Sequence, residues 1–240
     1  MEIKGIVCCL FEQSGVFRDA FRSLGYAALC ADIANDYGKT DAQLDLFVEI
    51  DRAYQNELSW FDKFTPNDLL LAFFPCVYFN QHNYMLFNGT DTIFSKMPVR
   101  QRSDYILERS RLRHEFYCEV VKLFTICETR GLRLIVENPN KDPHFLKQYF
   151  PWKPAVIDWN RRRRGDYFEK PTQYWFINCE PTSGFSRSSP PEIKTVDGLP
   201  GHHGSKCDPE RSLISPVYAR NFICDFILGK VQNNTEPTLF

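Results

Sequence analysis

The first third of the chain alternates apolar runs with a helical pattern. Residues 5–11 are continuously apolar, as in a strand that is covered on both faces. After a polar turn, residues 16–25 repeat apolar side chains every three or four positions, which predicts an amphipathic helix that ends at Gly25. A second apolar run, 26–30, leads to Asp32. A strand, a helix and a strand within roughly thirty residues predict a βαβ unit of a parallel sheet.

The pattern continues through the middle of the chain. Residues 44–50 form either a strand or a helix, and residues 69–74 are typical of a third buried strand. Residues 103–130 again repeat apolar positions every three or four residues, which predicts a long amphipathic helix. The run 132–136 predicts a further strand. We expect it to end at 137–139, because Pro139 cannot continue the hydrogen bonding of a strand.

The C-terminal part divides into shorter segments. Residues 173–178 resemble a strand, 182–212 are rich in Gly, Ser and Pro and predict an irregular connection, and 213–230 hold a helix. We expect residues 1–181 to form one α/β domain with a Rossmann-like, mostly parallel, doubly wound sheet. The C-terminal helix would pack back on that domain, and residues 231–240 would be a frayed tail.

Composition narrows the class of protein. The chain has 29 basic and 30 acidic residues, so its net charge of -1 gives it no overall preference for nucleic acid or membranes. A hydrophobic fraction of 43% is too high for a disordered chain. Nine cysteines without a CxxC pair fit reduced thiols better than a disulfide framework or a zinc ribbon. The first residues resemble neither a signal peptide nor a membrane span, so we expect a cytoplasmic protein without a membrane partner. We expect no metal, because His202 and His203 have no matching ligands nearby in the sequence.

The first two strand ends indicate a cofactor. The turn after the first strand has a single glycine, Gly15, whereas a pyrophosphate cofactor such as NAD or FAD needs several. S-adenosylmethionine, which lacks phosphate, can lie over such a turn. Asp32, at the end of the second strand, can accept hydrogen bonds from ribose hydroxyls; it fits a surface turn equally well.

The third and fourth strand ends carry a thiol and a carboxyl group. Cys76 can act as a nucleophile at the mouth of a cleft, although most cysteines are core residues. Glu137 can serve as a general acid, although most such acids lie in exposed loops. Carbon-5 of cytosine attacks a methyl sulfonium only after a thiolate adds to carbon-6 and ring nitrogen 3 is protonated. Together, Cys76 and Glu137 beside a methyl donor suit this chemistry.

At these positions the chain resembles the DNA cytosine-5 methyltransferases, and within them a short branch from phages and bacteria. The segments that carry the resemblance are Leu10-Phe11 with Gly15, Asp32-Ile33, Ala72-Phe73-Phe74-Pro75-Cys76 and Val136-Glu137-Asn138-Pro139. In the C-terminal half, residues 165–172, 174–176 and 210–212 are similar to the short branch. The resemblance therefore extends over most of the chain.

The resemblance implies a methyltransferase fold that uses S-adenosylmethionine to methylate cytosine in DNA. Cys76 would be the nucleophile, and Glu137 would hold and protonate the ring. The cofactor would contact Asp45, where the family contacts the adenine amino group, and residues at the first three strand ends: Phe11, Glu12, Ser14, Gly15, Asp32, Ile33 and Pro75.

The same resemblance bears on the nucleic-acid contacts. The arginines Arg161, Arg162, Arg163 and Arg164 stand where the family carries an arginine that helps to hold the base. They suit a phosphate backbone, but a solvated surface run is an equal alternative. The chain is too short for the family's large target-recognition domain, so a protein partner for DNA recognition is compatible with it. An RNA or nucleotide substrate, and a catalytically degenerate binding protein, remain alternatives.

Overall fold

A mixed seven-stranded sheet forms the centre of the protein. The computed structural model describes residues 1–80, 84–186, 188 and 213–230. The sheet has the order β3-β2-β1-β4-β5-β7-β6. Its strands are β1 (Val7–Leu10), β2 (Ala28–Asp32), β3 (Ala42–Gln43), β4 (Leu69–Ala72), β5 (Arg133–Pro139), β6 (Val156–Asp158) and β7 (Thr172–Ile177).

Most of the strand pairs are parallel. β1 pairs in parallel with β2 and β4, β2 with β3, and β4 with β5. β7 is antiparallel to both β5 and β6. The α/β class and the mostly parallel sheet are therefore confirmed, and the sheet is compatible with a Rossmann-like fold. The reversed direction of β7, which lies between β5 and the edge strand β6, was not predicted. The strand order changes direction between β1 and β4, which is the topological switch point of such a sheet.

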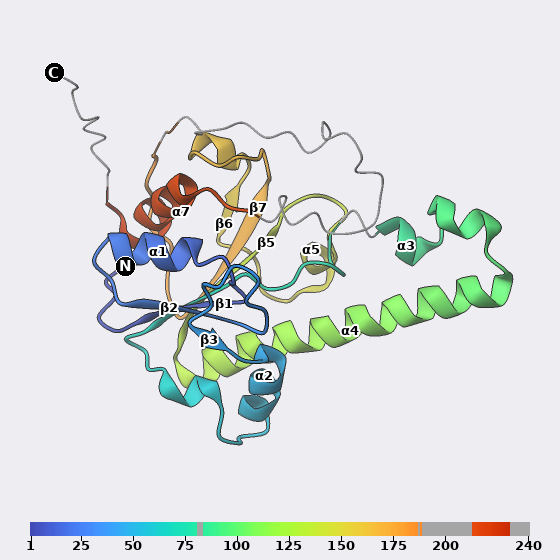
Figure 1. Ribbon diagram of the computed structural model, residues 1–240, viewed down its shortest axis with the longest axis horizontal. Helices are drawn as coiled ribbons and strands as arrows, with labels where there is room; N and C mark the ends of the chain where they lie inside the picture. Colours follow the sequence, from blue (N-terminus) through green and yellow to red (C-terminus); the bar gives the residue numbers. More distant parts are fainter. Residues whose placement is uncertain (81–83, 187, 189–212, 231–240) are drawn as a thin grey trace.

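Helices cover both faces of the sheet (Figure 1). α1 (Val16–Ser23) and α7 (Pro216–Phe222), which continues as the π-helix η5 (Ile223–Leu228), cover one face. α2 (Leu46–Tyr54) and the C-terminal half of α4 (Val99–Arg130) cover the other. Neighbouring residues of β1 and β4 alternate between these two cores. Both faces are thus buried, which explains why these strands read as continuous apolar runs.

The connection from β4 to β5 extends away from the body. It contains α3 (Tyr84–Asn88), the short helix η3 (Thr92–Lys96) and α4. A helix of 32 residues is about 48 Å long, far longer than the strands that it accompanies. Because α4 leads into the start of β5, its N-terminal half extends beyond the carboxyl ends of the strands (Figure 1). We call α3, η3 and residues 99–115 the arm.

Several sequence predictions can be compared with these elements. The undecided segment 44–50 lies mainly in helix α2, and the predicted long helix begins four residues earlier, at Val99. The strand predicted from the apolar run 132–136 ends within 137–139 as expected: β5 continues past the apolar run, and its last residue, Pro139, pairs with Thr172 of β7. Most of 182–212 and all of 231–240 lie outside the described residues.

The remaining short elements complete the body. They are η1 (Trp60–Lys63), α5 (Phe145–Tyr149) and η4 (Arg161–Arg163). Among the described residues, no helix has both the length and the apolar character that crossing a membrane requires.

Candidate functional site

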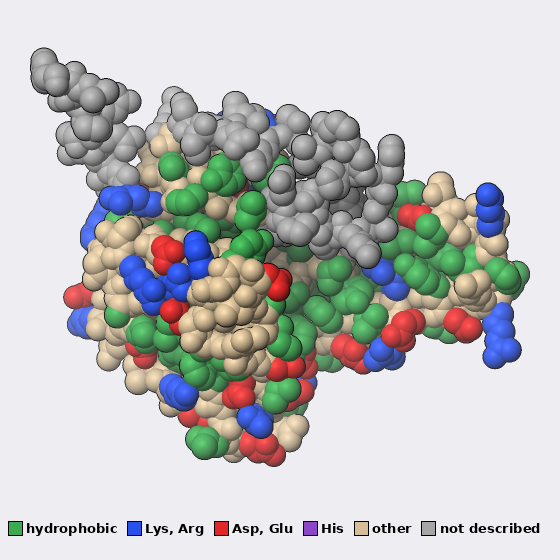
Figure 2. Space-filling view, in the orientation of Figure 1, with side chains coloured by type: hydrophobic (Ala, Val, Ile, Leu, Met, Phe, Trp, Pro, Cys, Tyr) green, Lys and Arg blue, Asp and Glu red, His purple; other side chains and the backbone are tan. Residues whose placement is uncertain are grey.

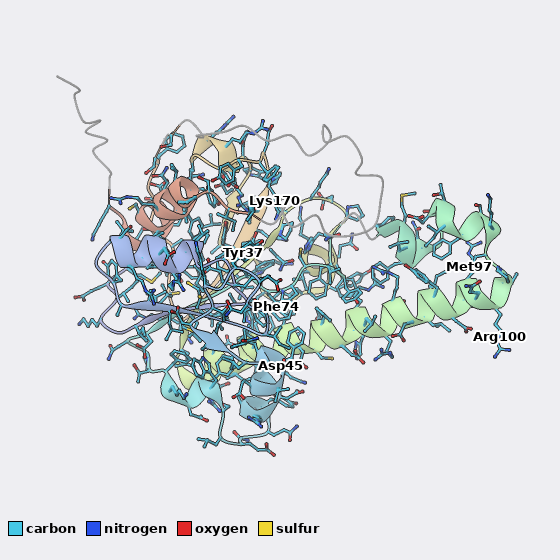
Figure 3. All side chains as sticks on the ribbon, in the orientation of Figure 1. Tyr37, Asp45, Phe74, Met97, Arg100 and Lys170 are labelled. Atoms are coloured by element: carbon cyan, nitrogen blue, oxygen red, sulfur yellow. The ribbon has the colours of Figure 1, made fainter. Side chains whose placement is uncertain are left out.

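The carboxyl ends of β1 and β4 lie side by side at the switch point. Residues of β1 pair in register with those of β4, from Val7 with Leu69 to Leu10 with Ala72. The turn after β1 and the segment Phe74-Pro75-Cys76 after β4 therefore meet at one edge of the sheet. The rings of Phe11 and Phe74 make an edge contact there, with centroids 5.3 Å apart. Figure 3 shows Phe74 in the middle of the body, where these strands end.

The turn after β1 is organised around the start of α1. Gly15 precedes the helix with a φ of 68°, and Phe11 adopts a φ of 57°, which is uncommon outside glycine. Glu12 is buried, and its Oε1 accepts hydrogen bonds from Phe17 N at 2.8 Å and Ser14 Oγ at 3.3 Å. Burial raises the pKa of Glu12, although these hydrogen bonds oppose the change. The Glu12 and Ser14 side chains thus support the helix N-terminus.

Three further predicted cofactor residues follow β2 and β3. Asp32 ends β2, and its Oδ1 accepts a hydrogen bond from Ala34 N at 2.8 Å. Partial burial raises the pKa of Asp32. The side chain of Ile33 is 61% exposed beside it. Asp45 follows β3, and its carboxylate caps α2 by accepting from Phe47 N and Val48 N.

The turn that carries Cys76 is joined to β5. The Cys76 carbonyl accepts hydrogen bonds from the backbone of Phe79 and Asn80, so the chain turns directly after the thiol. Asn138 is fully buried, and its Nδ2 donates to the carbonyl of Phe74 at 2.8 Å. β4 and β5 are adjacent parallel strands, and the two predicted catalytic residues come from their neighbouring ends. Because Asn138 directly follows Glu137, its hydrogen bond to Phe74 holds the segment before Cys76 close to Glu137.

Glu137 is a buried acid with an unused oxygen. It lies within β5, opposite Tyr174 of β7, and only 7% of its surface is exposed. Its Oε1 has no hydrogen-bond partner among the described residues. The nearest cation is Arg161, whose Nη1 lies 3.8 Å from Oε1, which is within ion-pair range but too long for a hydrogen bond. A buried polar atom without a partner requires an explanation, and a catalytic role is one of the usual ones.

The four arginines of the basic run face different environments. Arg161 is 1% exposed and pairs with Asp166 at 2.6 Å. Burial alone would lower the pKa of Arg161, but nearby acidic groups, above all Asp166, raise it above its ordinary value. Arg164 is also buried and forms ion pairs with Asp158 at 2.9 Å and Asp225 at 3.0 Å.

The other two members of the run are more accessible. Arg163 is exposed, and Arg162 is half-buried with its Nη1 3.9 Å from Glu169. The side chains of Arg161 and Arg164 are therefore not placed to contact a phosphate backbone, whereas those of Arg162 and Arg163 reach the surface.

More buried polar atoms without partners lie around the end of β5. Gln173 of β7 pairs with Asn138 in the sheet and shares a 3.4 Å contact with His144 Nδ1. Among the described residues, the atoms without hydrogen bonds include Asn138 Oδ1, Asn140 Nδ2 and Oδ1, His144 Nε2 and Gln173 Oε1. The sequence did not single out these residues, apart from Asn138 as part of a motif. The one sequence feature that could have indicated them is that some are polar residues close to Glu137 in the chain.

Comparisons with known proteins leave the family of this chain open. No family model matches the sequence, and no curated protein matches it either. Within the part of the chain that the structure describes, no group of three His, Cys, Asp or Glu side chains could hold a metal ion. The function must therefore be argued from the site itself.

Proposed function

We propose that the protein is a methyltransferase that uses S-adenosylmethionine to methylate carbon-5 of cytosine in DNA, through a covalent adduct with Cys76. The observation that carries the proposal is the junction between β4 and β5. There, Asn138 holds the segment before Cys76, and the adjacent Glu137 keeps a buried carboxyl oxygen without a hydrogen-bond partner among the described residues. A nucleophile and an acid that approach one ring need this kind of shared framework.

The two side chains divide the proton and electron-pair transfers between them. The Cys76 thiolate forms a bond to carbon-6 of the cytosine while the Glu137 carboxyl donates its proton to ring nitrogen 3. When bound, S-adenosylmethionine supplies the electrophilic methyl group that carbon-5 attacks. The carbon-5 proton then leaves to water, the bond between Cys76 and carbon-6 breaks, and the nitrogen-3 proton returns to Glu137. The thiolate and the acid are thus regenerated.

The residues of the first turn fit a cofactor without phosphate. A pyrophosphate would bind at the N-terminus of α1, but the carboxylate of Glu12 already accepts the backbone hydrogen bond of Phe17 there. Glu12 thus occupies the place that a pyrophosphate would need, which suits a cofactor without phosphate. Asp32 uses one carboxylate oxygen for Ala34 N, so it retains acceptor capacity for ribose hydroxyls, and exposed Ile33 offers an apolar surface to a purine.

The base must leave the stacked duplex to reach Cys76. Arg161, buried between Asp166 and Glu137, would position the Glu137 carboxyl from behind rather than contact phosphate. Arg162 and Arg163, nearer the surface, are better placed for the DNA backbone.

The test is covalent trapping on DNA in which 5-fluorocytosine replaces cytosine, because fluorine at carbon-5 prevents release of the adduct. Wild-type protein should form a covalent complex that needs S-adenosylmethionine. Cys76→Ser should abolish the complex, and Glu137→Gln should slow its formation by about 10²–10⁴-fold. Asp32→Ala should raise the S-adenosylmethionine concentration that trapping requires.

Matched controls separate chemistry from folding. Cys118 is also half-buried, so Cys118→Ser should trap DNA like the wild type. Asp36 is an exposed acid in the loop that follows Asp32, and Asp36→Ala should leave the cofactor requirement unchanged. A complex that persists in Cys76→Ser, or a folded wild type that forms none, would refute the proposal.

A further inference from the structure

A cavity of about 160 Å³ lies where the arm joins the body. Four segments line it: the turn after Cys76, helix α3, the middle of α4, and residues 143–149 around α5. Engineered apolar cavities of about 150 Å³ bind a benzene ring, so this one has room for a planar six-membered ring. Figure 2 shows hydrophobic side chains gathered on the arm and at its junction with the body.

The cation of this cavity is Arg113. Its guanidinium lies 3.8 Å from the ring centroid of Phe87 and 4.6 Å from that of Phe145. No salt bridge or hydrogen bond from Arg113 occurs among the described residues, and none of the described lining residues is acidic. Partial burial accordingly lowers the pKa of Arg113 below its ordinary value, although the group remains charged. An arginine that lies on aromatic rings without an acid is available for an anionic ligand.

A second arginine on the same face has similar surroundings. Arg109 lies one helical turn before Arg113 and sits 5.4 Å from the rings of both Tyr78 and Phe87. Arg111, between them in the sequence, points elsewhere and pairs with Glu108 and Glu115. The arm thus has one face where arginines meet aromatic rings and another where charges are neutralised.

A buried polar group also lines the cavity. His144 is 1% exposed, and its Nε2 has no hydrogen-bond partner among the described residues. Burial lowers the pKa of His144 to about 4, so the imidazole is neutral at pH 7 and can donate or accept one hydrogen bond there. Such an atom suits the polar edge of a base.

Aromatic rings connect the cavity with the candidate active site. Phe74, which precedes the Pro75-Cys76 segment, stacks on Phe79 at 6.3 Å, and Phe79 stacks on Phe145 at 6.0 Å. At the other side, Tyr84 and Tyr149 are 50% and 62% exposed, so their rings are accessible from solvent. A strand whose target base enters at Cys76 would therefore pass this cavity with its next nucleotide.

We propose that the cavity binds the nucleotide that neighbours the target cytosine in the DNA strand, with the base on its aromatic rings and the phosphate on Arg113. The position of this nucleotide next to the target cytosine rests on the proposed function, but binding of a nucleotide by the cavity can be measured separately. Base stacking on aromatic rings with an arginine for the backbone is how proteins hold single strands. The arm adds a favourable charge, because α3, η3 and residues 99–115 together contain six basic and three acidic side chains. Arg100, near its far end in Figure 3, belongs to this set.

The test is fluorescence anisotropy with a labelled twelve-nucleotide thymidine strand, over a range of salt concentrations. Arg113→Ala should weaken binding about tenfold and reduce the slope of log affinity against log salt by about one. Arg111→Ala removes the same charge from the same helix and should change affinity less than twofold. Tyr149→Ala should weaken binding about fivefold through lost stacking, whereas Tyr54→Ala, an equally exposed tyrosine on α2, should have no effect.

The outcomes distinguish this cavity from the catalytic proposal. Equal losses in Arg111→Ala and Arg113→Ala would mean diffuse attraction and would overturn the cavity assignment. Tighter binding of a uridine strand through Arg113 would overturn the assignment to DNA. If Arg113-dependent binding is observed but S-adenosylmethionine does not bind in a calorimetric titration, the methyltransferase function fails and the cavity stands. If trapping at Cys76 succeeds and Arg113→Ala binds DNA normally, the reverse holds.

Discussion

Two pairs of arginines in this protein have opposite surroundings. Arg161 and Arg164 belong to a run of four basic residues, yet both are buried and paired with carboxylates. Arg109 and Arg113 are separated by three residues on α4 and lie on aromatic rings, without a carboxylate partner among the described residues. The first pair neutralises buried carboxylates inside the protein, whereas the second is placed to bind a ligand.

The difference shows that the spacing of arginines along the chain decides whether they form a binding surface, more than how many stand together in the sequence. In the short helix η4, adjacent arginines point in different directions, so Arg161 enters the core while Arg163 reaches solvent. Residues four apart on an α-helix share a face, and Arg109 and Arg113 therefore act on one surface. A run of like charges in a sequence is thus a weaker guide to a binding surface than two charges at helical spacing beside aromatic residues.

The largest effect that would test this comparison is on stability. Arg164→Ala leaves Asp158 and Asp225 buried without their cation, and Asp158 also accepts a hydrogen bond from Tyr218. We expect the free energy of unfolding, measured by urea denaturation, to fall by about 3–5 kcal/mol. Arg163→Ala, one residue earlier in the same run, should change it by less than about 0.5 kcal/mol. Similar losses for the two variants would contradict the buried pairing.

The second effect is the pH dependence of stability, which we expect the buried His144 of the cavity to produce. His144 has a pKa of about 4 when folded, because burial opposes its charge, and about 6.5 when unfolded. The unfolded chain therefore binds the extra proton between these values, so stability is complete above pH 6.5 and falls as the pH decreases. The loss amounts to about 2 kcal/mol between pH 7 and pH 4.5.

Denaturation at several pH values in His144→Asn and the wild type isolates this contribution. Glu12, whose pKa burial raises, acts with the opposite sign but contributes equally to both proteins. His144→Asn should lack the loss of about 2 kcal/mol, because it removes the one group that binds the extra proton. His114 is an exposed histidine on α4, and His114→Asn should behave like the wild type. Parallel curves for His144→Asn and the wild type would show that the imidazole is not buried in solution.

Hydrophobic periodicity was enough to predict most of the fold. The runs around β1, β2 and β4 and the long pattern of α4 depend on burial that the sequence records directly. The strand β3 could not be predicted, because a two-residue edge strand carries little hydrophobic pattern. The reversed direction of β7 could not be predicted either, because strand direction depends on pairing partners. Pro139 shows the same limit: its place in β5 follows from its pairing with Thr172 of β7, which the sequence does not record.

The candidate site was predictable only in part. The sequence placed Cys76 and Glu137 at strand ends, but their adjacency follows from the pairing of β4 with β5, which spacing alone does not give. The tie from Asn138 to Phe74 crosses 64 residues. The cavity under the arm draws on four segments of the chain, and Arg113 looked like one charge among many in an amphipathic helix. Long-range contacts of this kind leave no local signal.

The smallest effect completes the comparison between the two pairs. Arg113 is half-buried and its only described contacts are with rings, so Arg113→Ala should lower the free energy of unfolding by no more than about 1 kcal/mol. A side chain that binds a ligand is expected to contribute little to the fold, whereas Arg164 is expected to contribute much. If urea denaturation showed a loss in Arg113→Ala as large as in Arg164→Ala, the arginine would be a structural part of the arm, and its availability for a phosphate would have to be abandoned.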